Sequence, residues 1–530
     1  MTDTSNENGR KEGMKNQVKL YDRTVSPPLI ERIRKQEEGP DNAADPLKVV
    51  IDLNLNYREG VKQARAHVFD ILEDKIAVPE TRIDKRKSKL TNQYVFARLT
   101  PKEIRALARI VYDPDPNGIS RSQTDREIFQ IWPDFEISRL VTKSCVTIKA
   151  EAARRSFQAL GNGIVWAVLD SGIDKTHLHF ERHATLDLSK LNPPLRHMDF
   201  TQIYTSGNKS DPIQITQKEN DAALTDGLGH GTHVAGIIAG EYLVDCDAPE
   251  DEQAEVSVLR ADEHGIENNR TYHEAHISGV APLCKLVSVK VLDENGNGEV
   301  SNILAALAKI HEINAQGSWI KIHGVNMSLG YEFDPEWFAC GQSPICVEVN
   351  RLVNSGVVVV CSAGNSGWGS KDTDKTGYLR SGMLMTINDP GNAEKAITVG
   401  STHRDMPHTF GASYFSSKGP TGDGRMKPDL LAPGERIVSC GAGQELERRR
   451  GVTEGKANYL DQSGTSMAAP HVSGAIAAFM SINKEFITQP EKIKQIFMEN
   501  ATCLGRDKYM QGAGLVDLMR AIQFQSVESY

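Results

Sequence analysis

"GIVWAVLDSG", residues 163–172, is the stretch that most clearly indicates the fold. Its apolar run, residues 164–169, is unbroken and then gives way to Asp-Ser-Gly. A strand with one wet face alternates apolar and polar residues, whereas an unbroken apolar run bounded by turn residues is typical of a strand buried on both faces. Strands of that kind belong to parallel sheets whose two faces are covered by helices.

Similar runs recur along the chain, at 284–293, 323–330, 356–365 and 395–401. Helical stretches lie between them, and "SNILAALAKIHEIN" (301–314) is the clearest. Strands that alternate with helices predict crossover connections and a parallel sheet. We therefore predict an α/β domain over residues 141–525, built on a doubly wound, mostly parallel sheet. Three polar or irregular segments are expected to be surface insertions: 241–275, 331–345 and 366–390.

The N-terminal part has a different pattern. Residues 1–45 are polar, mixed in charge and poor in aromatics, which predicts disorder. Residues 46–140 then alternate strand-like and helical patterns in the order β-α-β-α-β, at 47–55, 59–75, 92–99, 100–112 and 127–132. This order predicts a small two-layer α+β domain. The basic stretch 81–90 has no clear pattern, and another strand could lie there.

One helix of this domain has a defined start in the sequence. Thr100 and Glu103 have the spacing of a capping box, in which each side chain accepts a hydrogen bond from the other residue's backbone N–H. Pro101 falls at the first helical position, where its missing N–H has no helical partner to lose. The helix is therefore expected to begin at this point.

Composition excludes some classes of partner. The 530 residues are 39% hydrophobic and 25% charged, as in ordinary soluble domains, and the formal net charge is −9. An acidic chain is a poor match for nucleic acid or an anionic membrane, so we expect neither as a partner. No apolar run is long enough to span a membrane, and the polar N-terminus lacks the apolar core of a signal peptide. We expect a cytoplasmic location.

The eight cysteines form no C-x-x-C pair. Cys340 and Cys346 are the only close pair, and they could bridge within a loop. Scattered, reduced thiols fit a cytosolic chain better than a disulfide framework does.

Candidate catalytic residues follow the predicted strands. Ligands of open parallel sheets bind at the carboxyl ends of the strands. Asp170, Ser328 and Asn365 come directly after apolar runs, while His230 and Ser466 each lie where a loop enters an apolar helix. Taken singly, each has an ordinary interpretation as a turn residue, a helix cap or a structural histidine.

Together these residues supply the groups that nucleophilic catalysis by a serine requires. A serine hydroxyl is a weak nucleophile and needs an adjacent base. A histidine can be that base if a buried carboxylate orients its ring. The oxyanion that forms on attack needs fixed donors, which an asparagine amide and a backbone N–H can supply.

The motifs resemble a known family. "VLDSGID" (168–174), "HGTHVAG" (230–236) and "GTSMAAPHVSG" (464–474) are similar to the three signatures of the subtilisin-like serine peptidases, and they occur in that family's order, Asp, His, Ser. Further blocks resemble the same family: "GVAPLCKLVSVKVLDENGNG" (279–298), "NMSLG" (326–330), "SAGNSG" (362–367), "SSKGP" (416–420), "KPDLLAPG" (427–434) and "GAGLVD" (512–517). The resemblance covers about residues 140–520.

The resemblance implies a role for each matching position. Asp170 would orient His230, which would act as general base and acid. Ser466 would be the nucleophile. Asn365 would hold the oxyanion together with the backbone N–H of Ser466.

Other positions have implied roles too. Ser328, Leu329 and Gly330 would form one wall of the cleft and pair with substrate main chain. Pro470 is expected to be tolerated because the first turn of a helix has no N–H bond to lose. His233 lies three residues after His230, but no further metal ligand is near it in the sequence, so no metal site is predicted there.

The predicted function is therefore that of a serine endopeptidase, which hydrolyses proteins or peptides through an acyl-enzyme. The 46–140 domain resembles the family's inhibitory propeptide, which implies an intramolecular inhibitor removed by a self-cut within 136–145. An unrelated accessory domain is the alternative. A catalytically silent peptide-binding homologue is the rival function, against which the complete triad argues. A lipase would have G-x-S-x-G and the order Ser, Asp, His.

Two features depart from the family. The run after "DSGID" reads "KTHLHF" (175–180), with His179 where the family has an acid that binds calcium. The segment that normally contains the calcium loop reads "NNRTYHEAHIS" (268–278). We therefore expect no cofactor, with the usual calcium site degraded. By the same resemblance, the floor of the specificity pocket is expected near Asn388.

Overall fold

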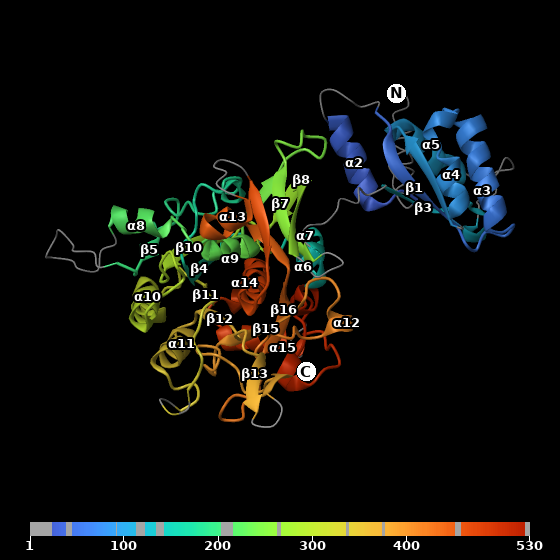
Figure 1. Cartoon of the computed structure of the whole chain (residues 1–530). Helices are drawn as coiled ribbons and strands as arrows, with labels where there is room; N and C mark the ends of the chain where they lie inside the picture. Colours follow the sequence, from blue (N-terminus) through green and yellow to red (C-terminus); the bar gives the residue numbers. More distant parts are fainter. Residues whose placement is uncertain are drawn as a thin grey trace, which may run out of the picture. The chain divides into compact units, whose positions relative to one another are not determined.

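The computed structural model describes the following residues: 24–38, 45–91, 93–112, 122–133, 143–202, 216–261, 267–334, 336, 339–373, 377–450 and 457–524. They fall into two compact units, Met1–Ser138 (the N-terminal unit) and Arg139–Tyr530 (the C-terminal unit) (Figure 1). The boundary predicted at residue 140 lies outside the described residues.

The N-terminal unit contains a three-stranded antiparallel sheet in the order β2-β1-β3. Its elements are β1 (Leu47–Leu53), α3 (Val61–Asp70), the π-helical turn Ile71–Lys75, β2 (Tyr94–Leu99), α5 (Pro101–Tyr112) and β3 (Ile128–Pro133). Alternate residues of β1, namely Val49, Ile51 and Leu53, are buried in one core with Ile104 and Leu107 of α5. The five predicted elements occur in the predicted order, but two further helices precede and interrupt them.

Helix α5 begins as expected. The Thr100 N–H donates to Glu103 Oε2 at 2.7 Å, and the Glu103 N–H donates to Thr100 Oγ1 at 3.3 Å. The basic stretch 81–90 contains no strand. It holds a short 3₁₀ turn (Glu80–Arg82) and helix α4 (Lys85–Leu90), which Asp84 caps by accepting from the Lys87 N–H at 2.9 Å.

The prediction of disorder for residues 1–45 is wrong for residues 24–38. Helix α2 (Pro27–Glu38) buries Leu29 and Ile33, which are four residues apart and so lie on one helical face. Val25 also forms a bridge with Ile131 of β3. The remainder of that segment, 1–23 and 39–44, lies outside the described residues.

The C-terminal unit is built on a seven-stranded sheet in the order β16-β15-β12-β11-β4-β10-β5, and every neighbouring pair is parallel. The strands are β4 (Val165–Asp170), β5 (Met198–Asp199), β10 (Lys285–Lys290), β11 (Gly324–Met327), β12 (Val358–Ser362), β15 (Ile397–His403) and β16 (Leu430–Glu435). The predicted parallel α/β sheet is confirmed.

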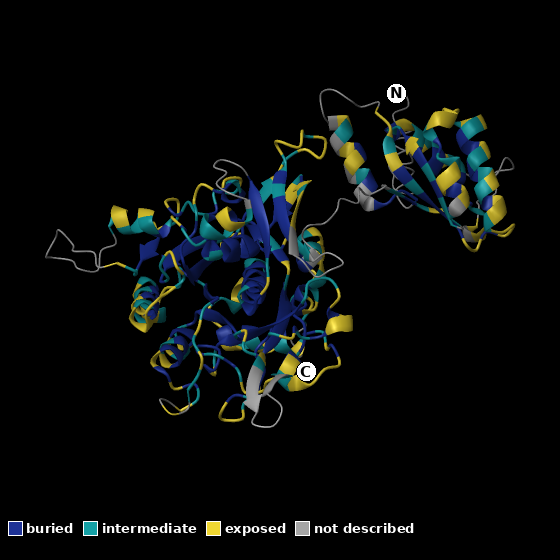
Figure 2. Ribbon diagram, viewed as in Figure 1, coloured by how far each residue is buried: buried dark blue, intermediate teal, exposed yellow. Residues whose placement is uncertain are grey.

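Helices cover both faces of this sheet. Trp166 and Val168 of β4 share a core with helices α9 (His230–Ile238) and α14 (Thr465–Ile482). Leu169 faces the other way and packs in a second core with α10 (Val300–Ile313) and α11 (Pro344–Asn354). Figure 2 shows the sheet and α14 as buried, with exposed residues on the outer helices and loops.

Segment 241–275, which the sequence predicts to be a polar or irregular surface insertion, contains a regular hairpin. Strands β7 (Ala254–Ala261) and β8 (Glu267–Glu274) pair antiparallel, and β7 pairs in parallel with β18 (Asn458–Gln462). With β17 (Ile437–Cys440) they form a second sheet in the order β17-β18-β7-β8. The hairpin is regular because Val256 and Val258 alternate inward into the core.

The remaining elements are short. Two small ladders join β6 (Glu241–Leu243) to β9 (His276–Ser278) and β13 (Trp368–Thr373) to β14 (Gly377–Gly382). The other helices are α6 (Lys143–Thr147), α7 (Ala150–Phe157), α8 (Gln217–Ala223), α12 (Pro407–Phe410), α13 (Gly443–Arg450), α15 (Pro490–Glu499), α16 (Lys508–Gln511) and α17 (Leu518–Ile522). Short 3₁₀ turns occur at Gln123–Asp125, Leu178–Phe180, Ala315–Gly317 and Lys484–Phe486.

All eight cysteines are free thiols, so Cys340 and Cys346 do not form a bridge. Of the helices that the structure describes, none is both long enough and apolar enough to cross a membrane.

Candidate active site

The candidate catalytic residues gather at the carboxyl edge of the seven-stranded sheet. Asp170 is the last residue of β4, Ser328 follows β11, and Asn365 lies three residues beyond β12. His230 is the first residue of α9, and Ser466 is the second residue of α14. Parallel strands end at one edge, which explains why residues so far apart in the sequence meet here.

Asp170 and His230 are joined by a short hydrogen bond. His230 Nδ1 lies 2.7 Å from Asp170 Oδ1, and the carboxylate is almost fully buried. The Ser171 N–H donates to the same oxygen at 2.8 Å. A carboxylate acceptor fixes the proton on Nδ1, which leaves Nε2 with the lone pair that a general base needs.

Asp226, a residue that sequence reasoning missed, supports this pair. Its Oδ1 accepts from Ser171 Oγ at 2.9 Å and from the Gly229 N–H at 2.8 Å. Its Oδ2 accepts from the N–H and the hydroxyl of Thr232, at 2.8 and 2.6 Å. The carboxylate therefore ties the first turn of α9 to the loop that carries Asp170. The available signal was an acid four residues before His230.

Electrostatics make His230 a stronger base. Burial alone would lower the pKa of the imidazole, but the charge and hydrogen bond of Asp170, followed by the charges of Asp226 and Glu445, outweigh it and raise the pKa above the usual value. Glu445 is on helix α13 and is a second contributor that the sequence did not suggest. A raised pKa increases the ring's affinity for the proton that a nucleophile gives up.

The Ser466 hydroxyl is held by a neighbouring backbone group. Ser466 Oγ donates to the Ser328 carbonyl at 3.0 Å, and Ser328 Oγ donates to the Ser466 carbonyl at 2.8 Å. The second bond also corrects the explanation for Pro470, which is the sixth residue of α14 and not part of its first turn. Proline there removes the bond that the Ser466 carbonyl would accept, and the Ser328 hydroxyl replaces it.

No hydrogen bond joins Ser466 to His230 within the described part of the chain. Both residues nevertheless line one open cleft of about 470 Å³, together with Asn365. Catalytic hydrogen bonds are often long in unliganded sites and shorten when substrate binds. The structure therefore brings together four predicted residues, with Asp170 behind His230.

Asn365 is oriented by Thr465. Asn365 Oδ1 accepts from the Thr465 N–H at 3.0 Å and from Thr465 Oγ1 at 3.1 Å. The amide nitrogen is then the group left to donate. The Ser466 N–H lies in the first turn of α14, where helix N–H groups lack partners, and makes no hydrogen bond within the described residues. These two donors suit an oxyanion.

Ser328, Leu329 and Gly330 continue from β11 along the site. Ser328 contacts Ser466 directly, whereas Leu329 and Gly330 do not line the cleft that holds Asn365. The backbone of these two residues makes no hydrogen bond within the part of the chain that the structure describes. Free N–H and C=O groups at the end of a strand can pair with an added strand.

Two other positions that the sequence singles out, His233 and Asn388, do not line this cleft. His233 is buried, with Nε2 3.1 Å from the Ile437 carbonyl, and burial lowers its pKa to about 3. Asn388 lies against the loop before Asn365, because a Cβ placed on Gly364 would be 2.7 Å from Asn388 Cγ. It does not line the cleft of His230 and Ser466.

The residues at the family's calcium position do not fit a calcium ion. His179 is fully buried, with Nδ1 3.0 Å from the Tyr459 hydroxyl and Nε2 3.2 Å from the Gly236 carbonyl. Burial and the nearby His177 lower its pKa to about 3, so the ring is neutral. Calcium takes six to eight oxygen ligands. Segment 268–278 forms β8 and β9, and no cluster of three or more acidic, histidine or cysteine residues in the described ranges could hold a metal.

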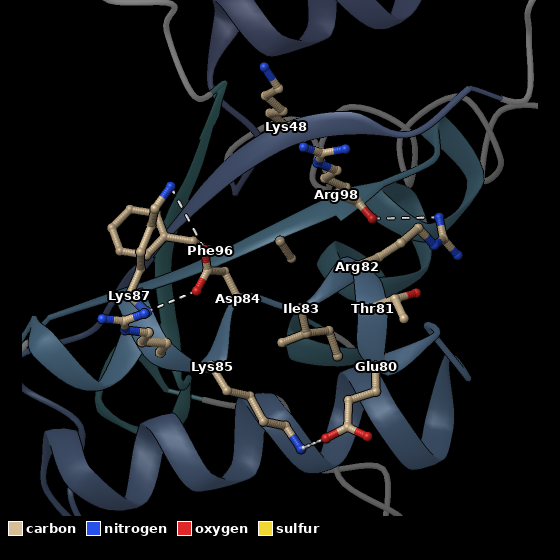
Figure 3. A pocket seen from close by; sticks show the side chains of 12 residues that line it. Lys48, Glu80, Thr81, Arg82, Ile83, Asp84, Lys85, Lys87, Phe96 and Arg98 are labelled. Atoms are coloured by element: carbon tan, nitrogen blue, oxygen red, sulfur yellow. Dashed lines mark hydrogen bonds and ion pairs between the residues drawn. The ribbon is translucent and has the colours of Figure 1, made fainter.

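A separate cavity of about 640 Å³ lies in the N-terminal unit (Figure 3). Half of its lining residues are basic, among them Lys48, Lys87 and Arg98. Lys85 forms an ion pair with Glu80 at 3.1 Å along its edge. The lining contains no histidine, cysteine or serine, so this cavity lacks a nucleophile and base of the kind found at the sheet edge.

Comparison with known proteins identifies the family. The sequence model of the subtilase family matches residues 161–515, a stretch that contains Asp170, His230, Asn365 and Ser466. The chain belongs to the subtilase family.

Several relatives resemble this subtilase over most of their length. The serine protease AprX of Bacillus subtilis is 29% identical over 410 residues, which cover 75% of either chain. An intracellular serine protease of Paenibacillus polymyxa is 30% identical over 367 residues, 68% of this chain and 81% of its own. Subtilisin E of Bacillus subtilis is 26% identical over 433 residues, 81% and 82% of the two chains. The protein is accordingly a serine peptidase that acts on proteins.

Proposed function

We propose that this subtilase is an endopeptidase that cleaves peptide bonds through Asp170, His230 and Ser466. The observation that carries the proposal is the 2.7 Å bond between Asp170 and His230 beside a cleft shared by His230, Asn365 and Ser466. A base with an oriented ring, a hydroxyl at a helix N-terminus and two free donors are the parts that acyl transfer needs.

Acylation begins with Ser466 Oγ. The hydroxyl gives its proton to His230 Nε2 and attacks the scissile carbonyl carbon, and the electron pair of the C=O bond moves to oxygen. The Asn365 amide and the Ser466 N–H donate to this oxyanion. When the C–N bond breaks, the leaving amine takes the proton from His230, and an ester to Ser466 remains.

Deacylation repeats these steps with water. His230 removes a proton from a water molecule that attacks the ester, and the tetrahedral intermediate then expels Ser466 Oγ, which recovers its proton from His230. Throughout, Asp170 keeps the ring in one tautomer and stabilises the imidazolium. The free backbone groups of Leu329 and Gly330 would pair with the substrate's main chain.

The direct test is Ser466→Ala. Cleavage of casein and of a quenched peptide should fall by several orders of magnitude, because only binding and the oxyanion donors remain. A variant that kept a tenth of the activity would exclude Ser466 as the nucleophile. Loss of cleavage with unchanged peptide affinity is expected, and binding without any cleavage by wild type would instead indicate a silent peptide-binding homologue.

We also propose that the N-terminal unit inhibits the enzyme until the chain cuts itself between residues 136 and 145. Support comes from the unit's own core and its order β1-α3-α4-β2-α5-β3, which partly reproduces the order of the family's propeptide. A tethered domain has a high effective concentration, so it can block a cleft despite modest affinity. Part of the proposed cut region lies outside the described residues.

Intact masses of wild type and Ser466→Ala test self-cleavage. Wild type should show a cut within 136–145, and Ser466→Ala should stay full length. A separate fragment, 24–138, should inhibit the cut enzyme, and it includes α2 because Leu29 and Ile33 belong to its core. A fully active, uncut chain that ignores this fragment would make the unit an accessory domain.

We also propose a cytoplasmic location. The printed name of the Paenibacillus polymyxa relative describes it as intracellular. Immunodetection in separated cytoplasmic and secreted fractions of the source cell would decide the location.

A further inference from the structure

The cleft has a side that the proposed mechanism leaves unassigned. It is lined by His230, Asn365 and Ser466 but not by Ser328, Leu329 or Gly330. If the acyl part of the substrate pairs with that strand, the cleft lies on the leaving-group side of the nucleophile. The inference below rests on the proposed function, because it concerns substrate binding at that site.

Two arginines, Arg436 and Arg449, are among the residues that line this cleft. Arg449 Nη1 donates to Asp461 Oδ1 at 2.9 Å, and its Nη2 donates to the Asp461 carbonyl at 2.8 Å. Arg260, from the β7–β8 hairpin, places Nη1 3.5 Å from Asp461 Oδ2. The one buried carboxylate of Asp461 therefore faces two arginines, and Arg436 adds a third positive charge.

The guanidinium of Arg436 has no partner among the described residues. The Arg436 side chain is exposed, and no hydrogen bond or ion pair joins its guanidinium to any described residue. Burial lowers the pKa of Arg260. Repulsion by the charge of Arg404 lowers it further, the charge of Asp461 opposes this shift, and repulsion by Arg436 adds to it. An anion placed between these cations would relieve this repulsion.

The backbone at Arg436 is held in an unusual conformation. Its φ of 52° lies in the left-handed region, which is unfavourable for a residue with a Cβ. The Arg436 N–H donates to Ser463 Oγ at 2.9 Å, and its carbonyl accepts from Arg404 Nη1 at 2.9 Å. Glycine or asparagine would adopt this backbone more easily, so a cation is held here in a strained backbone conformation within the lining of the cleft.

An acid, Glu445, also lines the cleft, on the same helix as Arg449. Glu445 raises the pKa of His230 through its charge, and is only loosely paired with Arg448 at 3.5 Å. An acidic substrate side chain would be repelled near Glu445 and attracted near Arg436. The charge of Arg436 therefore favours an acidic side chain close to it.

We propose that this peptidase prefers substrates with a glutamate or aspartate at the first or second position after the scissile bond, bound by Arg436. Arg260 and Arg449 share the single carboxylate of Asp461, which leaves a net positive charge beside it. A guanidinium can donate two parallel hydrogen bonds to a carboxylate, which gives the subsite geometric as well as electrostatic selectivity.

The test uses internally quenched peptides of one parent sequence. Each of the first three positions after the cut carries Glu, Gln or Lys in turn, and kcat/KM is measured for every peptide. Active enzyme is counted with a fluorophosphonate, so that partly folded protein does not distort the values. Wild type should prefer Glu over Gln roughly three- to tenfold at the first or second position, and the preference should shrink in 0.5 M NaCl.

Variants assign the preference to one side chain. Arg436→Gln should abolish it, Arg436→Glu should transfer it to Lys, and Arg436→Asn gives a second neutral side chain that suits the left-handed backbone. Arg351→Gln is the control, since Arg351 is an exposed arginine of α11 paired with Glu348 and absent from the cleft. It should keep the wild-type ratio.

Two results would overturn the proposal. Equal kcat/KM for Glu and Gln peptides in wild type would show that no acidic subsite exists. An unchanged ratio in Arg436→Gln and Arg436→Asn would show that another group binds the carboxylate. Failure to cleave any peptide would contradict the proposed function itself, which separates the two claims.

Discussion

The side-chain carbonyl oxygen of Asn365 is held by the protein, whereas its amide nitrogen is available to donate. Thr465 holds the carbonyl oxygen with two hydrogen bonds, so the amide nitrogen is pre-oriented before substrate arrives. A donor fixed in advance needs no reorganisation when charge develops, which is why such groups act mainly on the transition state.

Asn365→Ala should therefore lower kcat and leave KM nearly unchanged. Loss of one donor of this type costs roughly 10²–10³ in kcat in a related serine protease, and we expect a loss of that order here. Steady-state kinetics on one quenched peptide would measure it. Asn295→Ala, at an exposed loop position, is the control. An effect on KM alone would make Asn365 a substrate-binding residue.

Glu445 should set part of the pH dependence. Its negative charge favours protonated His230 and raises the pKa of the ring, and only the neutral ring is a base. Glu445→Gln removes that charge and lowers this pKa, so the acidic limb of kcat/KM should move to lower pH. The carboxylate is partly exposed, so we expect a shift below about 1 pH unit.

The pH profile of kcat/KM for wild type, Glu445→Gln and Glu447→Gln would measure this shift. Glu447 is an exposed acid on the same helix that does not line the cleft, so its variant should match wild type. If the acidic limb of kcat/KM does not move in Glu445→Gln, or moves to higher pH, the Glu445 charge does not raise the pKa of His230 as assigned.

Motifs in the sequence were sufficient to indicate Asp170, His230, Asn365 and Ser466. They did not indicate Asp226 or Glu445, because the bond of Asp226 to Ser171 and the effect of Glu445 on His230 join segments that only the folded chain brings close. Pro470 shows the same limit, since the group that replaces its missing hydrogen bond comes from Ser328, more than a hundred residues earlier.

Among the elements, helix α9 must be placed accurately, because its first residue, His230, is the general base. Asp226 accepts four hydrogen bonds, three of them from residues in or next to the first turn of α9. The helix start is thus fixed by a buried carboxylate outside the helix, in the manner of a cap.

Asp226→Asn should disturb this start, because an amide nitrogen would face one of the N–H donors. We expect kcat to fall about 10–100-fold through displacement of His230 and the free energy of unfolding to fall by about 1–3 kcal/mol. Kinetics and urea unfolding would measure both. Asp221→Asn, at an exposed acid of α8, should change neither. Wild-type kcat in a destabilised Asp226→Asn would restrict Asp226 to a purely structural role.

Strand and helix patterns predicted the buried elements well and the polar ones poorly. The apolar runs became β4, β10, β11, β12 and β15. Helix α4, "KRKSKL", has almost no apolar face, so periodicity could not detect it, and the cap at Asp84 was the only local signal. The β7–β8 hairpin was missed because its polar composition concealed the inward Val256 and Val258.

For the whole molecule, the sequence predicted a parallel sheet but not its strand order. β4 comes first in the chain yet lies between β11 and β10, which are separated from it by more than a hundred residues. Such an order depends on crossovers that pack helices on both faces, and local patterns contain no information on it.

Stability of the C-terminal unit should not depend on calcium. His179 and its aromatic neighbours fill the place where the family has an acid, and a ligand stabilises a fold only if the fold binds it. Thermal unfolding with EDTA and with added CaCl₂ should give melting temperatures within about 2 °C of each other. A fall of many degrees on chelation would reveal a calcium site outside the positions considered.

The central claim is that Ser466 is a nucleophile activated by His230. A fluorophosphonate reacts with such a serine, and peptide mapping by mass spectrometry locates the adduct. We predict one adduct per wild-type chain, on the peptide that contains Ser466, together with loss of casein hydrolysis, and almost no adduct in Ser466→Ala or His230→Ala. An adduct on another residue, or equal labelling of Ser466→Ala, would contradict the account.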